Sequence, residues 1–208
     1  MNVRWYFDFI SPFTYLQWPK VRALAEQQPI EFKPVLLAGL LERNGHKGPA
    51  EIPAKRLFTY RHVTWLARRQ GMSLRFPPAH PFNPLHALRL CIAAGTTPEA
   101  ISAIFNWLWA EGRAGDSMAA LAPLIQRFGI DDPALLSSEP VKTKLRQNFD
   151  DAVAEDVFGV PTLSVDGQLF WGNDAHAFAL AFIGDPGLFS DPDMRLLDEI
   201  PVGASRRI

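Results

Sequence analysis

The chain of 208 residues is long enough for one domain, or for one domain with a large insertion, and its 48% hydrophobic residues argue against disorder. A net charge of −1 without a basic face argues against nucleic-acid binding. Because Cys91 is the single cysteine, an internal disulfide and a Cys-x-x-Cys redox or zinc motif are excluded, and the histidines show no metal-ligand spacing.

The N-terminal residues run directly into a strand pattern and lack the basic-then-apolar order of a signal peptide. No apolar run approaches the roughly 18 residues that a membrane span requires. We therefore expect a cytoplasmic protein without a membrane partner.

The first 36 residues predict a strand, a helix and a second strand. Residues 3–10 alternate with the period of two that is typical of a strand, which we expect over 3–9. Ser11 and Pro12 then form a helix start, with serine as N-cap and proline at the first helical position. The helix is expected to run to about Gln27, and residues 30–36 complete a βαβ unit.

The composition changes after Gly39, and most of residues 44–150 predict helices. A loop rich in glycine and proline precedes a helix over 55–70. Further helices are expected from Asn83-Pro84, from Thr97-Pro98, from near Ser117 to Gly129 and over 140–155, because apolar residues recur there at helical spacing or a cap precedes them. Cys91 lies in one apolar helix and is expected to be inert core.

Strand patterns return near the C-terminal end. Residues 160–165 and 168–171 flank Asp166-Gly167, a two-residue hairpin turn, and residues 174–184 predict a closing helix. The order βαβ, helical insertion, ββα is the plan of the thioredoxin fold, in the α/β class. We expect a thioredoxin-like domain over 1–43 and 151–208, and a helical insertion domain over 44–150.

Two motifs mark the expected active end of this fold. Ser11-Pro12-Phe13-Thr14 stands at the turn where thioredoxin-like oxidoreductases carry Cys-x-x-Cys. Val160-Pro161 opens the third strand, where the fold carries a cis-proline, so we expect the Val160–Pro161 peptide bond to be cis. A disulfide oxidoreductase is excluded, because neither position of the redox pair is cysteine.

The chain resembles the 2-hydroxychromene-2-carboxylate isomerases, relatives of the kappa-class glutathione transferases within the DsbA-like group. The segments that carry the resemblance cover residues 6–13, 51–56, 82–84, 157–162 and 170–174. It implies glutathione as cofactor, a small aromatic acid as substrate, a role in aromatic compound catabolism and a homodimer.

The resemblance also implies roles for individual residues. Ser11 would be the catalytic residue, and Phe13 and Asn83 would contact the substrate. Glutathione would be bound by His46, Lys55, Val160, Pro161, Asn173 and Asp174. The chain departs from the pattern at His46, where kappa enzymes carry asparagine, and at Ala175, where many relatives carry arginine.

Physical chemistry explains why a serine suits this position. A free thiol with a pKa near 8.5 is only a few per cent thiolate at neutral pH. A hydroxyl donor and a helix N-terminus both favour negative charge, and lowering the pKa by two units requires about 2.7 kcal/mol of preferential thiolate stabilisation. Ser11 would therefore donate to the glutathione thiolate and would not itself attack.

Other interpretations of the same residues remain open. Ser11 and Asn173-Asp174 are also typical helix caps, and Pro161 is also acceptable as an ordinary edge-strand proline. A hydrolase nucleophile is disfavoured because no Gly-x-Ser-x-Gly elbow surrounds Ser11. The alternative functions are a kappa-like glutathione transferase or peroxidase and a non-catalytic thioredoxin-like binding protein.

Overall fold

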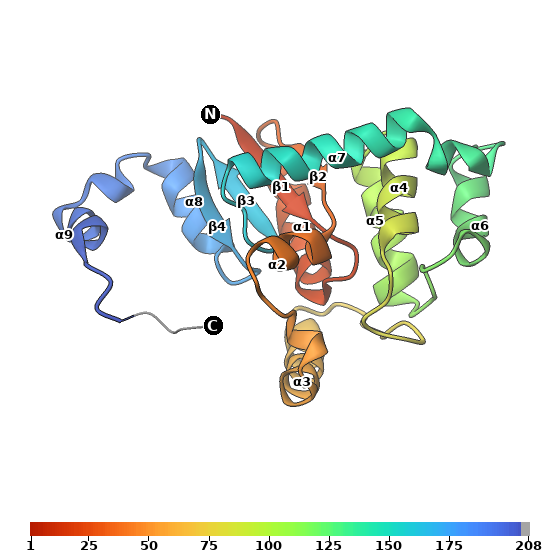
Figure 1. Cartoon of the computed structure of the whole chain (residues 1–208), viewed down its shortest axis with the longest axis horizontal. Coiled ribbons are helices and arrows are strands. Elements are labelled where there is room, and N and C mark those ends of the chain that lie inside the picture. The colour runs from red at the N-terminus through yellow and green to blue at the C-terminus, as the bar shows by residue number, and fades with distance from the viewer. Residues whose placement is uncertain (205–208) are drawn as a thin grey trace.

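The computed structural model describes residues 1–204 and shows a four-stranded mixed sheet with helices on both faces (Figure 1). The strands are β1 (Val3–Phe7), β2 (Glu31–Pro34), β3 (Thr162–Val165) and β4 (Gln168–Trp171), in the order β2-β1-β3-β4. β1 is parallel to β2 and antiparallel to β3, and β4 is antiparallel to β3. This confirms the thioredoxin fold with a helical insertion that the chain order of strands and helices predicted.

The helices follow the predicted order with ends shifted by one or two residues. They are α1 (Pro12–Ala25), α2 (Leu37–Arg43), α3 (Pro53–Arg69), α4 (Leu85–Ala93), α5 (Pro98–Phe105), α6 (Met118–Arg127), α7 (Glu139–Ala154), α8 (His176–Gly184) and α9 (Pro192–Leu196). A π-helical segment, Asn106–Ala110, continues α5, and neither it nor α2 nor α9 was expected from the sequence. Within residues 1–204, no helix has the length and apolar character needed to cross a membrane.

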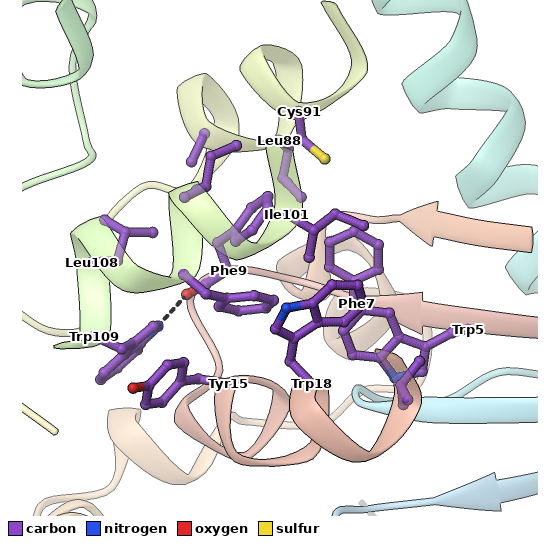
Figure 2. Close-up of a cluster of buried hydrophobic side chains, with 14 of the residues drawn as sticks. Trp5, Phe7, Phe9, Tyr15, Trp18, Leu88, Cys91, Ile101, Leu108 and Trp109 are labelled. Atoms are coloured by element: carbon purple, nitrogen blue, oxygen red, sulfur yellow. Dashed lines mark hydrogen bonds between the residues drawn. The ribbon is translucent and has the colours of Figure 1, made fainter. Parts of the chain in front are cut away.

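One face of the sheet is packed with aromatic rings, as Figure 2 shows. The Trp5 ring stacks on Phe7 at 4.4 Å and on Trp18 of α1 at 5.3 Å between centroids. Phe9 contacts Phe105 of α5 at 4.7 Å. The helical segment and the sheet therefore share one hydrophobic core, and Cys91 of α4 lies fully buried in it, as expected.

The opposite face of β1 is also covered. Tyr6 packs there with Leu40 of α2 and Ala152 of α7 in a second, smaller cluster. Because helices cover both faces, the alternation along β1 does not separate buried from exposed side chains, and Tyr6 and Asp8 are fully buried.

Helix α7 extends through the boundary expected between residues 150 and 151. Asn148 Nδ2 donates to the carbonyl of Pro34 at 3.0 Å, and Lys33 of β2 pairs with Asp151 at 2.7 Å. The second half of α7 is therefore fastened to the edge strand of the sheet.

A substitution at Trp109, in the π-helical segment, tests whether the helical insertion stabilises the loop that follows β1. Its Nε1 donates to the buried carbonyl of Phe9 at 2.8 Å. Replacing Trp109 with phenylalanine leaves that carbonyl without a donor, so we expect urea unfolding to show a loss of about 1–3 kcal/mol. Leu197→Ala, at a position that is 58% exposed, is the control and should change stability by less than about 0.5 kcal/mol. Equal effects of the two substitutions would contradict this role for Trp109.

Candidate active site

The strand register brings Ser11, Val160-Pro161 and Asn173-Asp174 to the same end of the sheet. Tyr6 pairs with Thr162, and Thr162 pairs with Trp171. The end of β1, the start of β3 and the end of β4 therefore lie side by side. Ser11 follows β1 by a short turn, Val160-Pro161 directly precedes β3, and Asn173-Asp174 follows β4 after Gly172. The fold thus brings the N-terminal Ser11 turn to the same end of the sheet as the two segments that flank the C-terminal hairpin.

Ser11 is the N-cap of α1, and two hydrogen-bond donors at this helix start are available to a ligand: the Ser11 hydroxyl and the Phe13 N–H. Its Oγ accepts the Thr14 N–H at 3.4 Å, which confirms the predicted N-cap. Because the Oγ only accepts in that bond, the hydroxyl proton remains free to donate. Pro12 has no N–H, and the Phe13 N–H has no partner within the described part of the chain. Both donors lie at the positive end of the α1 dipole, where a negative charge is stabilised.

The loop that leads to Ser11 is held by two rings from the helical insertion. Trp109 Nε1 donates to the Phe9 carbonyl, the bond drawn in Figure 2. His80 Nε2 lies 2.9 Å from the Ile10 carbonyl. Because a carbonyl only accepts, Nε2 must carry the proton. The Tyr60 hydroxyl donates to the His80 carbonyl at 2.7 Å, and its oxygen also lies 2.7 Å from His80 Nδ1.

His80 contributes no positive charge to the site near neutral pH. Burial and, to a smaller degree, the charge of Arg56 lower the pKa of His80 and outweigh the effect of its bond to Ile10. The ring acts as a neutral support for the backbone that precedes Ser11.

Hydrogen bonds of Asp8 also hold the same loop. Its carboxylate accepts the N–H of Ile10 at 3.1 Å and the N–H of Leu37, the first residue of α2, at 2.8 Å. Its own carbonyl accepts the Ser11 N–H at 3.2 Å. Burial raises the pKa of Asp8 to about 7, against the three backbone N–H groups that favour its charged form. The carboxyl group therefore titrates near neutral pH directly beneath the serine turn.

The Val160–Pro161 bond is cis, as predicted from the motif. Thr162 Oγ1 donates to the Gly159 carbonyl at 2.7 Å and fixes the turn that precedes the proline. Val160 lies outside the β ladder, and its N–H and C=O have no backbone partner among residues 1–204. An extended peptide has the strand-like hydrogen-bonding groups needed to pair there.

Gly172 joins the Asn173-Asp174 segment to the rest of the edge. Its N–H donates to the Pro161 carbonyl at 2.8 Å, and its carbonyl accepts from Gln17 of α1 at 3.0 Å. Its φ of +102° lies in the region that favours glycine, and a Cβ there would meet Asp174 Oδ1 at 2.5 Å. Glycine therefore allows the Asp174 carboxylate to lie close to the backbone beside the cis-proline.

Among residues 1–204, the side chains of the remaining predicted residues make no hydrogen bond or ion pair with this cluster. His46 and Lys55 are exposed, on the loop after α2 and in the first turn of α3, and no side-chain hydrogen bond or ion pair joins them to the cluster within the described residues. Asn83 Oδ1 accepts the Leu85 N–H at 3.0 Å and so caps the start of α4. Phe13 is half-buried, with its ring 6.0 Å from that of His62 on α3.

Several residues that organise the site carried little signal in the sequence. Asp8 stands out only as a lone acid within a run of aromatic strand residues. His80, Tyr60 and Trp109 reach the serine turn from more than 45 residues away, so no local pattern identifies them. Gln17 and Lys20 look like ordinary polar positions of α1.

A thioredoxin fold whose first helix begins with serine defines a thioredoxin-like protein without a redox cysteine pair. The model of the DSBA-like thioredoxin domain matches residues 2–183. The chain is 30% identical over 183 residues to a 2-hydroxychromene-2-carboxylate isomerase of Pseudomonas putida, covering 84% of this chain and 90% of that protein. It is 23% identical over 207 residues to glutathione S-transferase kappa 2 of Caenorhabditis elegans, covering 88% and 92%.

A solved structure of 2-hydroxychromene-2-carboxylate isomerase superimposes with a TM-score of 0.75 at 25% identity, covering 93% of this chain and 99% of that one. The chain therefore belongs to the DSBA-like thioredoxin family and, within it, to the 2-hydroxychromene-2-carboxylate isomerase family of enzymes, which is related to the kappa-class glutathione transferases.

The buried carboxyl of Asp8 predicts a specific pH dependence of stability. The unfolded chain ionises Asp8 near its ordinary pKa of 3.8, whereas the folded protein does so only near 7. Folding therefore becomes less favourable as the pH rises from 4 to 7, by an amount on the order of 4 kcal/mol for this group. Asp8→Asn removes the titration and should also lower stability at every pH by a constant amount, because an acceptor is lost.

The measurement is the difference in free energy of unfolding between wild type and Asp8→Asn, from urea titrations at pH 4, 5, 6 and 7. We expect the wild type to lose stability relative to the variant across this range. A difference that is independent of pH would mean that Asp8 does not titrate as the structure indicates.

Proposed function

We propose that the protein isomerises an aromatic acid of the 2-hydroxychromene-2-carboxylate type with glutathione as its cofactor. The observation that carries the proposal is the pair of free donors at the start of α1, the Ser11 hydroxyl and the Phe13 N–H. They stand beside an open strand-like backbone at cis-Pro161. The reaction class is that of the similar proteins, which are 2-hydroxychromene-2-carboxylate isomerases.

The residues present fit glutathione. Its cysteinyl unit has peptide groups that match the free N–H and C=O of Val160. Its γ-glutamyl end carries an ammonium group, for which the Asp174 carboxylate is a suitable acceptor, and its glycyl carboxylate suits the Lys55 cation. His46 presents an imidazole where kappa enzymes carry an amide, and we assign it a contact at the same end as Lys55.

Bound glutathione would supply a thiolate that adds reversibly to a conjugated carbon of the substrate, so that a double bond becomes free to rotate. Ser11 donates its hydroxyl proton in a hydrogen bond to the sulfur and keeps it in the charged form. The Phe13 N–H and the α1 dipole act in the same direction. Because both donors are fixed by the loop bonds of Asp8, His80 and Trp109, little reorganisation is required.

Aromatic side chains near the sheet edge suit an aromatic substrate. Phe158 and Trp171 are 40% and 55% exposed, and their rings meet edge to face at 5.2 Å. Phe13 lies in the first turn of α1, two residues after Ser11. We propose that these rings contact the substrate, and that Asn83, whose Oδ1 accepts the Leu85 N–H, contacts it through its amide nitrogen.

Two further parts of the proposal concern consumption of glutathione and assembly. The similarity to kappa-class transferases favours, as a second candidate, a transferase or peroxidase that consumes glutathione. The homodimer remains a prediction. The exposed apolar residues of α3, which extends away from the sheet in Figure 1, are the surface that we propose a second copy covers: Leu57, Phe58 and Trp65.

Measuring whether glutathione is consumed during turnover distinguishes the isomerase from the transferase. Glutathione at a hundredfold excess over its dissociation constant should stabilise the protein by about 2.7 kcal/mol, read as a rise in melting temperature. During turnover of a 2-hydroxychromene-2-carboxylate, all glutathione should be recovered by chromatography. Consumption equal to product formed would support the transferase instead, and no thermal shift at millimolar glutathione would support a non-catalytic role.

Substitutions at Ser11 separate the catalyst from the helix cap. Ser11→Ala removes both functions and should cost about 1 kcal/mol of stability, whereas Ser11→Gly costs only a few tenths because glycine is tolerated at the N-cap. Both variants should raise the pKa of the bound thiol toward about 8.5, measured by thiolate absorbance in the ultraviolet. Isomerisation rates should fall by about tenfold for each 1.4 kcal/mol of lost stabilisation. If the Ser11→Gly variant is fully active, Ser11 serves only as a helix cap and the proposed catalytic role is wrong.

A further inference from the structure

Lys20 of α1 reaches the segment that follows β4. Its Nζ lies 3.0 Å from Asn173 Oδ1 and 3.4 Å from the Asn173 carbonyl. An ammonium group only donates, so the oxygen of the Asn173 side chain must face Lys20. The amide nitrogen is thereby turned away from Lys20, and it has no hydrogen-bond partner within residues 1–204.

The charge of Lys20 is only weakly compensated. It is half-buried, its two acceptors are both neutral, and no ion pair involves it in the described residues. Burial lowers its pKa, and the more distant Asp174 carboxylate raises it. Nearby His176 is neutral near pH 7, since burial and Lys20 lower its pKa, and its buried Nδ1 has no partner among residues 1–204. Residue 175 is alanine, so α8 supplies no cation in its first turn.

We propose that Lys20, acting through Asn173, strengthens binding of the α-carboxylate of the γ-glutamyl group, whose α-ammonium the Asp174 carboxylate accepts as proposed above. Lys20 is a positioning residue: it orients Asn173 so that the Nδ2 hydrogens face the carboxylate, and it adds positive charge behind them. The site thus presents opposite charges from α1 and from the start of α8, which match the two charges of a free α-amino acid terminus. This inference rests on the proposed use of glutathione.

The test compares glutathione with an analogue in which the glutamyl α-carboxylate is converted to a primary amide. By calorimetry, wild type should bind glutathione at least about tenfold more tightly than it binds the amide analogue. A tenfold difference in affinity corresponds to the loss of one charge-assisted hydrogen bond. Lys20→Met should lose this preference, and Lys20→Arg should retain most of it. Arg22→Met removes one exposed positive charge from the same helix and should keep the full preference.

Each outcome decides the inference. Equal binding of the two ligands by wild type, or a preference that survives in Lys20→Met, would overturn the role of Lys20 and leave the glutathione proposal intact. Failure of wild type to bind glutathione at all would overturn both proposals. Thermal melting of the ligand-free proteins checks that each variant is folded. If Lys20→Met is unfolded, Lys20→Gln takes its place. The inference then requires that Lys20→Gln loses the preference for glutathione over the amide analogue and that Lys20→Arg retains it.

Discussion

The backbone of residues 8–11 is held from three directions, and the rest of the site depends on it. The Asp8 carboxylate binds it to the start of α2, and His80 and Trp109 donate to the carbonyls of Ile10 and Phe9. These two donors come from the helical insertion, so the insertion positions Ser11 as well as covering the sheet. Leaving such buried carbonyls without donors costs about 1–3 kcal/mol each, which explains why rings with fixed N–H groups are packed there.

The electrostatics of the serine turn arise from dipoles more than from charges. His80 is neutral near pH 7, and the nearest buried acid, Asp8, is protonated over part of the physiological range. Stabilisation of a thiolate there would come from a hydroxyl, a backbone N–H and the α1 dipole, all fixed in orientation. An ionised Asp8 opposes that negative charge, so its high pKa is also an advantage for a thiolate below neutral pH.

Features set by local chemistry were predictable from the sequence. The Ser11-Pro12 helix start, the Asp166-Gly167 hairpin and cis-Pro161 each follow from residues adjacent in the chain. Helix α2 was missed because its seven residues continue from the second strand without a cap that the sequence identifies. The supports of the serine turn were missed for another reason, since their partners meet only when the insertion packs on the sheet. The roles of His46 and Lys55 still rest on the family resemblance.

A chain of hydrogen bonds connects the core to the proposed ligand site. Trp5, at the centre of the aromatic cluster, donates to Gln17 Oε1 at 2.7 Å, and Gln17 donates to the Gly172 carbonyl at 3.0 Å. Gly172 in turn donates to the cis-proline carbonyl and leaves room for Asp174. Every group in this chain has its partner inside the protein, so the position of Asn173-Asp174 is fixed by the same packing that stabilises the sheet. A site built in this way is preorganised, which reduces the entropy that the protein segment itself would otherwise lose when a ligand binds.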